Sequence, residues 1–429
     1  MDLPTQNLAL MLYDKHDLRL DTKLMPALKE NQVRIQVIAD SSCHSTYKFL
    51  NQGKSHPRGR FLPSVVGHEL SGEVVEVGRD CENHFSIGDK VTVQPPIMWM
   101  GEEKPLGYCY PEMGGLMQYA VLSEEALTTG SVIKFEGPFY QGSLAEPLSC
   151  NLSAIRRQTH YREGSDRAFY GLLPGGVTVI LGIGGPMGRG LNLMAMYGVE
   201  KPGVIIGTEV DPRVIEKFNQ WFPQEEYQQL GIKFKLVNPR EQNLQEIIMQ
   251  YSKNRGADDV FAMVAHPSVY SQIDLILGGK RHDSPCSSLF AGPEDQNQIF
   301  AASAHPYHYG PRNYTATKCG TIESMEHVLA KISFGQIDPA RMIIAVQGLD
   351  SAKEMVKNMP SLGGKNLVYN HIRMPRVEVD KFREASEQHP EPYKTIFEEL
   401  GVMVAANKGV WGANCEQYLL AQDLIRLRP

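Results

Sequence analysis

The stretch Gly67-His68-Glu69-Leu70-Ser71-Gly72-Glu73-Val74-Val75-Glu76-Val77-Gly78 places an imidazole and a carboxylate side by side at the start of a valine-rich run. Valine favours β-strands, so we expect a strand that begins just after Glu69. Gly72 and Gly78 carry no side chain and allow the backbone to pass close to a neighbouring segment. Imidazole and carboxylate groups both bind zinc, so the stretch predicts a strand that starts at a metal site.

Two other positions offer the further ligands that a zinc site needs. Cys43 follows an apolar run of strand length, 33–39, and Glu146 lies in Leu144-Ala145-Glu146-Pro147-Leu148. Cys43, His68 and Glu146 would leave one zinc position open, which distinguishes a catalytic from a structural zinc. Each has an ordinary alternative, because a lone buried cysteine is usually a core residue and a carboxylate before proline can cap a helix.

Glu69 has two possible roles beside this metal. It is either an alternate ligand that exchanges with water or a partner that supports a ligand through a hydrogen bond. The sequence leaves both roles open.

Length and charge restrict the class of protein. A chain of 429 residues is too long for one ordinary core, so we expect two domains. The net charge of −6 argues against a nucleic-acid surface. We expect no signal peptide and no membrane span, because the start has no basic segment and no apolar run is long enough. The seven scattered cysteines without a C-x-x-C favour reduced thiols in the cytoplasm.

The first part of the chain, from about Leu8 to Val93, reads as short strands with glycine and proline turns. This pattern predicts a twisted, mostly antiparallel, barrel-like domain. We expect its strands at 9–13, 34–39, 72–77 and 90–94. The segment 95–115 is expected to be irregular.

A different periodicity follows a helix expected at 148–158. Strand-sized apolar runs alternate with segments of helical spacing, which indicates βαβ units and a doubly wound parallel sheet. The expected strands are 177–181, 204–208, 234–237, 259–264, 287–290 and 314–317. The expected helices between them are 213–222, 244–252 and 268–277, and a closing helix is expected at 416–426.

A glycine loop joins the first of these strands to a helix. It reads Gly182-Ile183-Gly184-Gly185-Pro186-Met187-Gly188 and is typical of a turn that brings backbone N–H groups against a pyrophosphate. Two alignments are open: Ile183 occupies the first glycine position, or the loop is one residue longer and starts at Gly182. A turn in an unrelated α/β protein would be the ordinary alternative.

An acidic residue marks the end of the next expected strand. Glu209 stands where a carboxylate would bond the adenosine ribose hydroxyls of a dinucleotide and repel a 2′-phosphate. We therefore expect NAD(H) rather than NADP(H), although Arg213 nearby weakens this preference.

The pattern G-H-E-x-x-G-x-x-x-x-x-G, followed by Gly88-Asp89-Lys90-Val91, resembles the zinc signature of the medium-chain dehydrogenase/reductase family of alcohol and polyol dehydrogenases. The chain is most similar to the family's sugar-phosphate and polyol branch. This narrower likeness rests on Cys43-His44-Ser45-Thr46-Tyr47-Lys48, Glu146-Pro147-Leu148-Ser149-Cys150, Gly185-Pro186-Met187-Gly188, Phe290-Ala291-Gly292-Pro293 and Gly363-Gly364-Lys365-Asn366-Leu367-Val368-Tyr369.

The resemblance implies a GroES-like β-barrel catalytic domain and a doubly wound Rossmann domain. We expect these at residues 1–153 and 154–335, with a return to the catalytic domain and a C-terminal extension at 336–429. It also implies one catalytic zinc. The family's second, structural zinc needs four cysteines near 95–115, where this chain offers only Cys109, so we expect no second metal.

The resemblance also implies roles at the reacting centre. Ser45 matches the hydroxyl that relays a proton to the substrate oxygen. Lys48 occupies the distal relay position and could relay the proton or bind a substrate phosphate. Lys54, His56, Arg58 and Arg60 follow without an intervening acid, which favours phosphate binding by Lys48, Lys54 and Arg58, although such runs are often solvated loops.

The expected reaction is hydride transfer between NAD(P)H and a ketose phosphate such as L-sorbose 1-phosphate. A dehydrogenase of an unphosphorylated polyol or secondary alcohol is the near alternative. A non-catalytic dinucleotide-binding protein is the alternative of another class. By analogy with the family we expect a homo-oligomer, a dimer or a tetramer, with no nucleic-acid partner.

Overall fold

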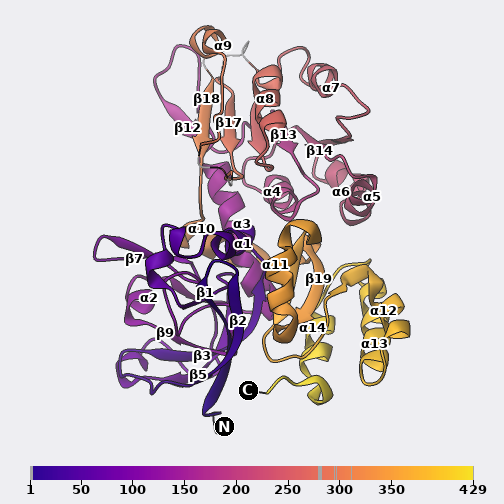
Figure 1. The fold of residues 1–429 in the computed structure, drawn as a ribbon. Helices are drawn as coiled ribbons and strands as arrows, with labels where there is room; N and C mark the ends of the chain where they lie inside the picture. Colours follow the sequence, from indigo (N-terminus) through magenta and orange to yellow (C-terminus); the bar gives the residue numbers. More distant parts are fainter. Residues whose placement is uncertain (1–2, 279–282, 294, 296, 311, 429) are drawn as a thin grey trace. The chain divides into compact units, whose positions relative to one another are not determined.

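The computed structural model describes residues 3–278, 283–293, 295, 297–310 and 312–428. The chain forms two units, Met1–Glu146 with Met325–Pro429 and Pro147–Ser324 (Figure 1). Both boundaries fall inside helices, α3 (Phe139–Arg156) and α10 (Ile322–Ser333). The domain boundaries expected at 153 and 335 lie a short way further along the chain.

The first unit is built around β3 (Val33–Ser41), which pairs antiparallel with β5 (Leu70–Val77), β9 (Tyr119–Leu122) and β20 (Lys365–Tyr369). All but one of the β3 residues are buried, as expected for a strand covered on both faces. The sheet order is β10-β6-β5-β3-β20-β19-β21, with β9 added beside β3. The other strands are β10 (Val132–Lys134), β6 (Lys90–Val93), β19 (Ile343–Gly348) and β21 (Val377–Glu378).

A second sheet of the first unit has the order β2-β1-β4. Its strands are β1 (Gln6–Asp14), β2 (Asp17–Leu24) and β4 (Ser64–Val65). Pairing is antiparallel except between β19 and β20, which confirms the mostly antiparallel domain predicted from the sequence.

Gly72 and Gly78 have the role that their position predicted. A Cβ atom at Gly72 would lie 2.4 Å from the Gln36 carbonyl oxygen on β3, and one at Gly78 would lie 2.4 Å from the Glu30 carbonyl oxygen. Any side chain at these positions would push β5 away from its neighbours. The close approach therefore fixes where β5 begins and with it the place of His68 and Glu69.

The rest of the first unit differs from expectation at two places. Residues 95–115 contain a hairpin, β7 (Pro96–Trp99) and β8 (Glu102–Pro105), where an irregular segment was expected. The closing helix α14 spans Ala413–Leu420 and is followed by a 3-10 turn at Asp423–Ile425, so the helix predicted at 416–426 is wrong in its second half. The helix ends because the following backbone pairs with residues 371–373, where the Arg373 N–H donates to the Ile425 carbonyl.

Helices cover the edges of the first unit. They are α1 (His44–Gln52), α2 (Glu124–Thr128), α11 (Ala352–Leu362), α12 (Phe382–Gln388) and α13 (Tyr393–Ala406).

The second unit is a fully parallel sheet of order β15-β14-β13-β16-β17-β18. Its strands are β13 (Val177–Leu181), β14 (Val204–Thr208), β15 (Lys233–Val237), β16 (Asp259–Ala262), β17 (Cys286–Leu289) and β18 (Asn313–Ala316). The order reverses at β13, so a ligand is expected at the carboxyl ends of β13 and β14. The doubly wound sheet predicted from the alternating pattern is confirmed.

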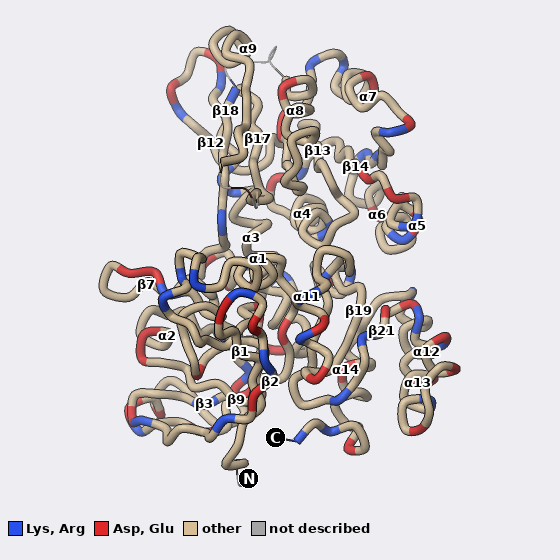
Figure 2. The backbone as a smooth tube through the Cα atoms, in the orientation of Figure 1, with Lys and Arg blue, Asp and Glu red and all other residues tan. Residues whose placement is uncertain are grey.

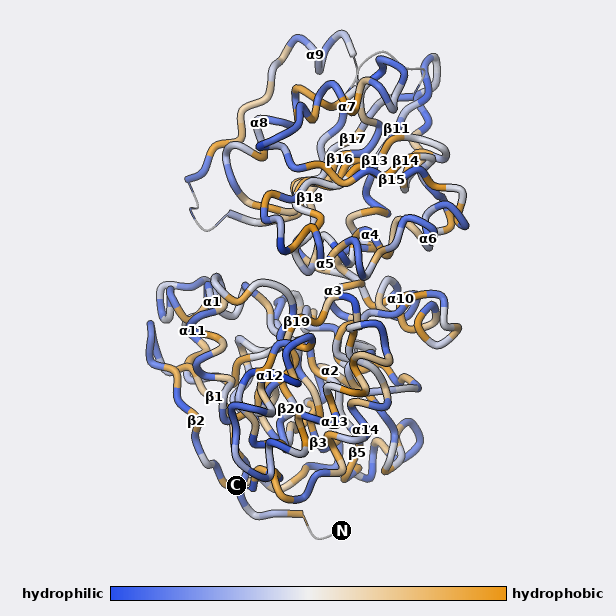
Figure 3. Tube along the Cα trace, turned by 90° about the vertical axis from the view of Figure 1, so that its right-hand side faces the viewer, coloured by the Kyte–Doolittle hydropathy of each residue, from blue (hydrophilic) through white to orange (hydrophobic). Residues whose placement is uncertain are grey.

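The helices of the second unit connect these strands. They are α4 (Pro186–Met196), α5 (Pro212–Trp221), α6 (Gln224–Gln229), α7 (Leu244–Tyr251), α8 (Pro267–Ile276) and α9 (Ala304–Tyr309). A hairpin of β11 (Thr159–Tyr161) and β12 (Ala168–Tyr170) precedes the sheet. The apolar segments in Figure 3 coincide with the central strands, whose β13 and β14 residues are all buried.

Acidic and basic residues are interspersed over both units (Figure 2), in keeping with the small net charge of −6. None of the helices in the described ranges has the length and apolar content needed to span a bilayer.

Candidate metal centre and dinucleotide site

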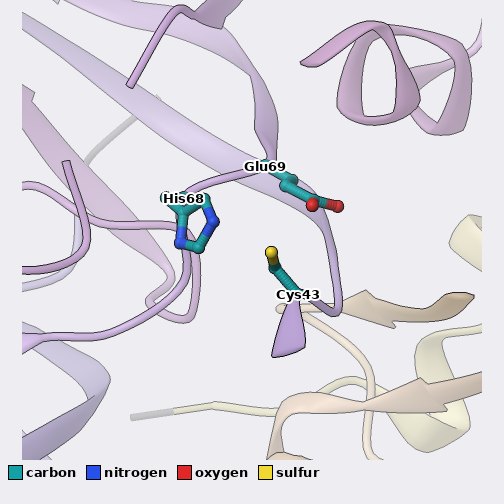
Figure 4. Close-up of side chains that lie close together, drawn as sticks. All are labelled: Cys43, His68 and Glu69. Atoms are coloured by element: carbon teal, nitrogen blue, oxygen red, sulfur yellow. The ribbon is translucent and has the colours of Figure 1, made fainter. Parts of the chain in front are cut away.

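Cys43, His68 and Glu69 come together at the ends of two paired strands. Cys43 is the N-cap residue of α1, just after β3, and the other two lie just before β5. One ligand atom from each residue lies within 4.8 Å of those of the other two. In Figure 4 the Cys43 sulfur points towards the space between the His68 ring and the Glu69 carboxylate. The antiparallel pairing of β3 with β5 explains how residues separated in sequence meet.

The Glu69 carboxylate is already engaged by protein donors. It accepts hydrogen bonds from the Ser41 hydroxyl and from the Lys365 ammonium group, which also donates to the Ser42 carbonyl at 2.9 Å. Glu69 and Lys365 are 1% and 2% exposed, so this ion pair is shielded from water. A carboxylate held in this way is suited to support a metal ligand, although its proximity to Cys43 and His68 also suits an alternate ligand.

Lys365 was not identified as a site residue from the sequence, although it lies in the Gly363–Tyr369 motif. It begins β20, and its partner Glu69 is 296 residues away in the chain. Lysine is rarely buried without a partner. A buried lysine next to several acids partly compensates the negative charge that a thiolate and carboxylates would accumulate.

Glu146 lies inside a helix rather than at its start. α3 begins at Phe139, nine residues earlier than the helix predicted at 148, and contains Pro147 in its interior. The alternative that Glu146 caps a helix is therefore wrong. Ser143, one turn earlier on the same helix face, donates to the Glu69 carbonyl at 2.5 Å and ties α3 to the metal-ligand segment.

The Glu146 carboxyl is buried beside the three clustered residues. It is 6% exposed, and burial, followed by the charge of Glu69, raises its pKa to about 8, while His68 acts in the opposite direction. Burial also raises the pKa of the Cys43 thiol, and the charge of Lys365 opposes this shift. Within the described residues, Glu146 is not one of the group whose ligand atoms lie within 4.8 Å of one another.

These donors fit a zinc ion in kind and in position. A thiol, an imidazole and carboxylates are the ligands that zinc takes in proteins. The His68 Nδ1 atom is buried and has no hydrogen-bond partner among the residues that the structure describes. A buried polar atom without a partner is costly, and a bound cation would give this imidazole a further interaction.

Ser45 and Tyr108 lie next to the candidate ligands. The Ser45 Oγ atom is 2.9 Å from the Cys43 sulfur and 3.3 Å from His68 Nε2. Tyr108 lies beside Ser45, and burial raises the pKa of the Tyr108 hydroxyl. The Tyr108 ring lies against His68, with centroids 5.5 Å apart. Tyr108 was not predicted, because it lies in a stretch without regular periodicity.

The basic run 48–60 is paired with acids from elsewhere. Lys54 forms an ion pair with Asp14 at 3.3 Å, and Arg58 forms one with Glu103 at 3.1 Å. These pairings favour a local structural role for Lys54 and Arg58 over the predicted phosphate contact. Lys48 is half-buried on α1, one turn after Ser45, and therefore shares its helix face.

The glycine loop of the second unit fits the longer of the two alignments. Gly182 directly follows β13 and has φ +92, a conformation that favours glycine. A Cβ atom at Gly188 would lie 2.2 Å from the Gly182 carbonyl oxygen, so Gly188 allows α4 to pack closely on the strand. Ile183, by contrast, is buried against Gly207.

The loop also presents a helix N-terminus. α4 starts at Pro186 after the N-cap residue Gly185, so the amides of its first turn are available to an anion.

Glu209 lies against this loop at the end of β14. A Cβ atom at Gly184 would be 2.2 Å from the Glu209 Oε2 atom. The Oε1 atom accepts hydrogen bonds from the amides of Val210 and Asp211, at 2.7 and 3.0 Å. The Arg213 guanidinium pairs with Asp211 at 2.9 Å.

All seven cysteines are free in the structure. They are at positions 43, 81, 109, 150, 286, 319 and 415.

Comparisons with known proteins agree with this geometry. Residues 29–137 match the family described as the alcohol dehydrogenase GroES-like domain. The chain is 30% identical over 423 residues to mannitol-1-phosphate 5-dehydrogenase of Aliivibrio fischeri, covering 97% of this chain and 98% of that protein. It is 28% identical over 419 residues to L-sorbose 1-phosphate reductase of Klebsiella pneumoniae, covering 96% and 97%.

The crystal structure of 2R,3R-butanediol dehydrogenase from Bacillus subtilis has the same fold. It superposes with a TM-score of 0.67 at 21% identity, covering 85% of this chain and 99% of that one. The relatives of the present chain are named as enzymes, which favours an enzyme over a non-catalytic dinucleotide-binding protein. The chain is an oxidoreductase and belongs to the medium-chain family of zinc-type alcohol and polyol dehydrogenases.

Proposed function

We propose that the protein catalyses reversible hydride transfer between NAD(H) and the carbonyl of a ketose phosphate, the class of substrate named in its relative L-sorbose 1-phosphate reductase. Cys43, His68 and Glu146 would hold one catalytic zinc, with Glu69 as supporting residue or alternate ligand. The observation that carries the proposal is the convergence of Cys43, His68 and Glu69 beside Ser45, with the buried Glu146 carboxyl near them. A bound zinc would polarise the substrate carbonyl as a Lewis acid.

Residues beside the candidate ligands would transfer the proton to the substrate oxygen. Ser45 is placed to give a proton to the substrate oxygen, because its hydroxyl lies among the candidate ligands. Tyr108 lies beside this hydroxyl and would help to orient it. Its half-buried ring packs against His68 and covers that side of the imidazole.

Replacing Ser45 by alanine should lower kcat by about 10²–10⁴-fold, the usual contribution of general acid–base catalysis. Zinc content should not change, because Ser45 is not a ligand. Steady-state kinetics and metal analysis on the same preparation check this. Ser86→Ala is the matched control, since Ser86 is exposed and belongs to another turn of the first unit. Wild-type kcat in the Ser45 variant would exclude the relay.

A substrate screen separates the ketose phosphate from the unphosphorylated polyol. NADH oxidation should be faster with phosphorylated ketoses than with the matching free sugars at equal concentration. The relatives include both kinds of enzyme by name, a mannitol-1-phosphate dehydrogenase and sorbitol dehydrogenase. Equal or faster reaction with free sugars would favour the polyol dehydrogenase.

Replacing Lys48 by alanine should raise KM for the phosphorylated sugar by about 10–100-fold, the worth of a charge-assisted hydrogen bond. The KM for a free sugar should change little. Lys54→Ala is the comparison, because Lys54 is exposed and paired with Asp14. An equal fall in kcat for both sugars would assign Lys48 to the proton relay instead.

A further inference from the structure

The carboxylate of Glu416, in the C-terminal extension, is buried at the start of α3. It is 4% exposed on α14 and accepts hydrogen bonds from the amides of Phe139 and Tyr140, at 2.6 and 2.8 Å. It also accepts one from the Tyr369 hydroxyl at 2.8 Å. Burying a carboxylate is costly unless its oxygens are hydrogen-bonded, and these three donors supply that compensation.

Phe139 and Tyr140 are the first two residues of α3, whose amides have no partner within the helix. Pro138 precedes them and has no side-chain acceptor, so the local sequence provides no cap. Glu416 supplies this cap from 277 residues further along the chain. Its negative charge is also favourable at a helix N-terminus.

The segment of α3 that Glu416 holds is the one that reaches the metal site. Ser143 on this segment donates to the Glu69 carbonyl, and Glu146 lies one turn later. Pro147 lies inside the helix directly afterwards and has no N–H to donate to the Ser143 carbonyl four residues before it. Residues 139–146 therefore lack one helical hydrogen bond to the rest of α3, which adds to the importance of their N-terminal anchor.

A second connection runs through β20. Tyr369 at the end of this strand is bonded to Glu416 and to the Trp411 indole N–H, the latter at 2.9 Å. Lys365 at its start is paired with Glu69. The extension thus contacts two of the elements that surround the candidate ligands, α3 and β20.

We infer that Glu416 is a positioning residue: by capping α3, the C-terminal extension holds Glu146 in place as a metal ligand. This inference rests on the proposed zinc site. It gives the extension, for which the sequence suggested no function, a role in metal affinity.

The test compares zinc affinity in full-length wild-type, Glu416→Gln and Tyr369→Phe proteins by competition with a zinc chelator. Glu416→Gln should weaken zinc binding by about 10–100-fold, as the loss of a residue supporting a metal site typically does. Tyr369→Phe should weaken zinc binding less than Glu416→Gln does, because it removes one donor to Glu416 and leaves both amide bonds to Glu416 intact. This control separates lost capping from general destabilisation.

Hydrogen exchange in the zinc-free proteins gives an independent readout. Peptides covering 139–146 should exchange faster in Glu416→Gln than in Tyr369→Phe, and peptides covering β3 should not differ. If Glu416→Gln does not fold, Glu416→Asp keeps the charge, withdraws it by one methylene, and should give a smaller effect in the same direction.

The outcomes separate the two proposals. Wild-type protein without a Cys43-dependent zinc would contradict the proposed function. Tight zinc binding in the wild type, with unchanged affinity and exchange in both Glu416 variants, would overturn the positioning role and leave the proposed function standing.

Discussion

Replacing Cys43 by serine is expected to remove most of the bound zinc and to lower kcat/KM by about 10³-fold or more, because metal polarisation of a carbonyl contributes several kcal/mol to transition-state stabilisation. A serine hydroxyl is not ionised at neutral pH and is a poor replacement for thiolate. His68→Ala should have a similar effect, since it removes another candidate ligand of the same cluster. Metal analysis and kinetics on the same preparations measure both quantities.

The matched control for this prediction is Cys81→Ser. Cys81 is also buried in the first unit, within its hydrophobic core, at a site without clustered ligands among the described residues. It should lose some stability but keep its zinc and its kcat/KM within about 3-fold, since a buried cysteine behaves as a small apolar residue. Full zinc occupancy and activity in Cys43→Ser would refute the ligand assignment.

Replacing Glu209 by glutamine is expected to raise KM for NADH by about 10–100-fold, because hydrogen bonds to a charged group contribute about 1.5–3 kcal/mol. The same change should improve the use of NADPH relative to NADH, since it removes the charge that would repel a 2′-phosphate. The backbone N–H groups of Val210 and Asp211, which donate to the Glu209 Oε1 atom, can still donate to the glutamine oxygen. The variant therefore tests charge with little change in loop structure.

The KM ratio for NADH and NADPH, compared between wild type and variant, measures this effect. Glu216→Gln is the control, because Glu216 is an exposed residue on the adjacent helix α5. A wild-type preference for NADPH, or an unchanged ratio in Glu209→Gln, would contradict the assignment of Glu209 to the adenosine ribose.

The fold could be predicted from sequence where local pattern and tertiary structure agree. The run 177–181 is apolar except for Thr178, and all its residues are buried because β13 is covered on both faces, so its composition indicated a central parallel strand. The end of the chain shows the opposite case. The helix expected to continue to Arg426 ends at Leu420, and residues 425–427 pair with residues 371–373 instead. Pairing with residues 371–373, and not the local sequence pattern, therefore determines the conformation of this segment.

The start of α3 was missed for a related reason. Proline is favoured in the first turn of a helix, so Glu146-Pro147 reads as a helix start. In the structure the helix begins at Phe139, where its first amides are capped by Glu416. No pattern near Phe139 indicates this cap, because the acceptor comes from the C-terminal extension.

Part of the candidate site could be predicted because its residues belong to one compact motif. His68 and Glu69 are adjacent and directly precede β5, and Cys43 lies just after β3, the strand that pairs with β5. Lys365 and Tyr108 were missed because their roles depend on contacts with residues distant in sequence. The same limit applies to the basic run. It contains no acid in sequence, yet its cations meet Asp14 and Glu103 in space.

The most direct test of the zinc site is X-ray absorption at the zinc edge of the purified protein. We expect one sulfur ligand at about 2.3 Å and nitrogen or oxygen ligands at about 2.0–2.2 Å, as for a catalytic zinc with a single cysteine. The sulfur contribution should disappear in any zinc that remains bound to Cys43→Ser. A protein without zinc, or a zinc surrounded by sulfur alone, would contradict the proposed centre.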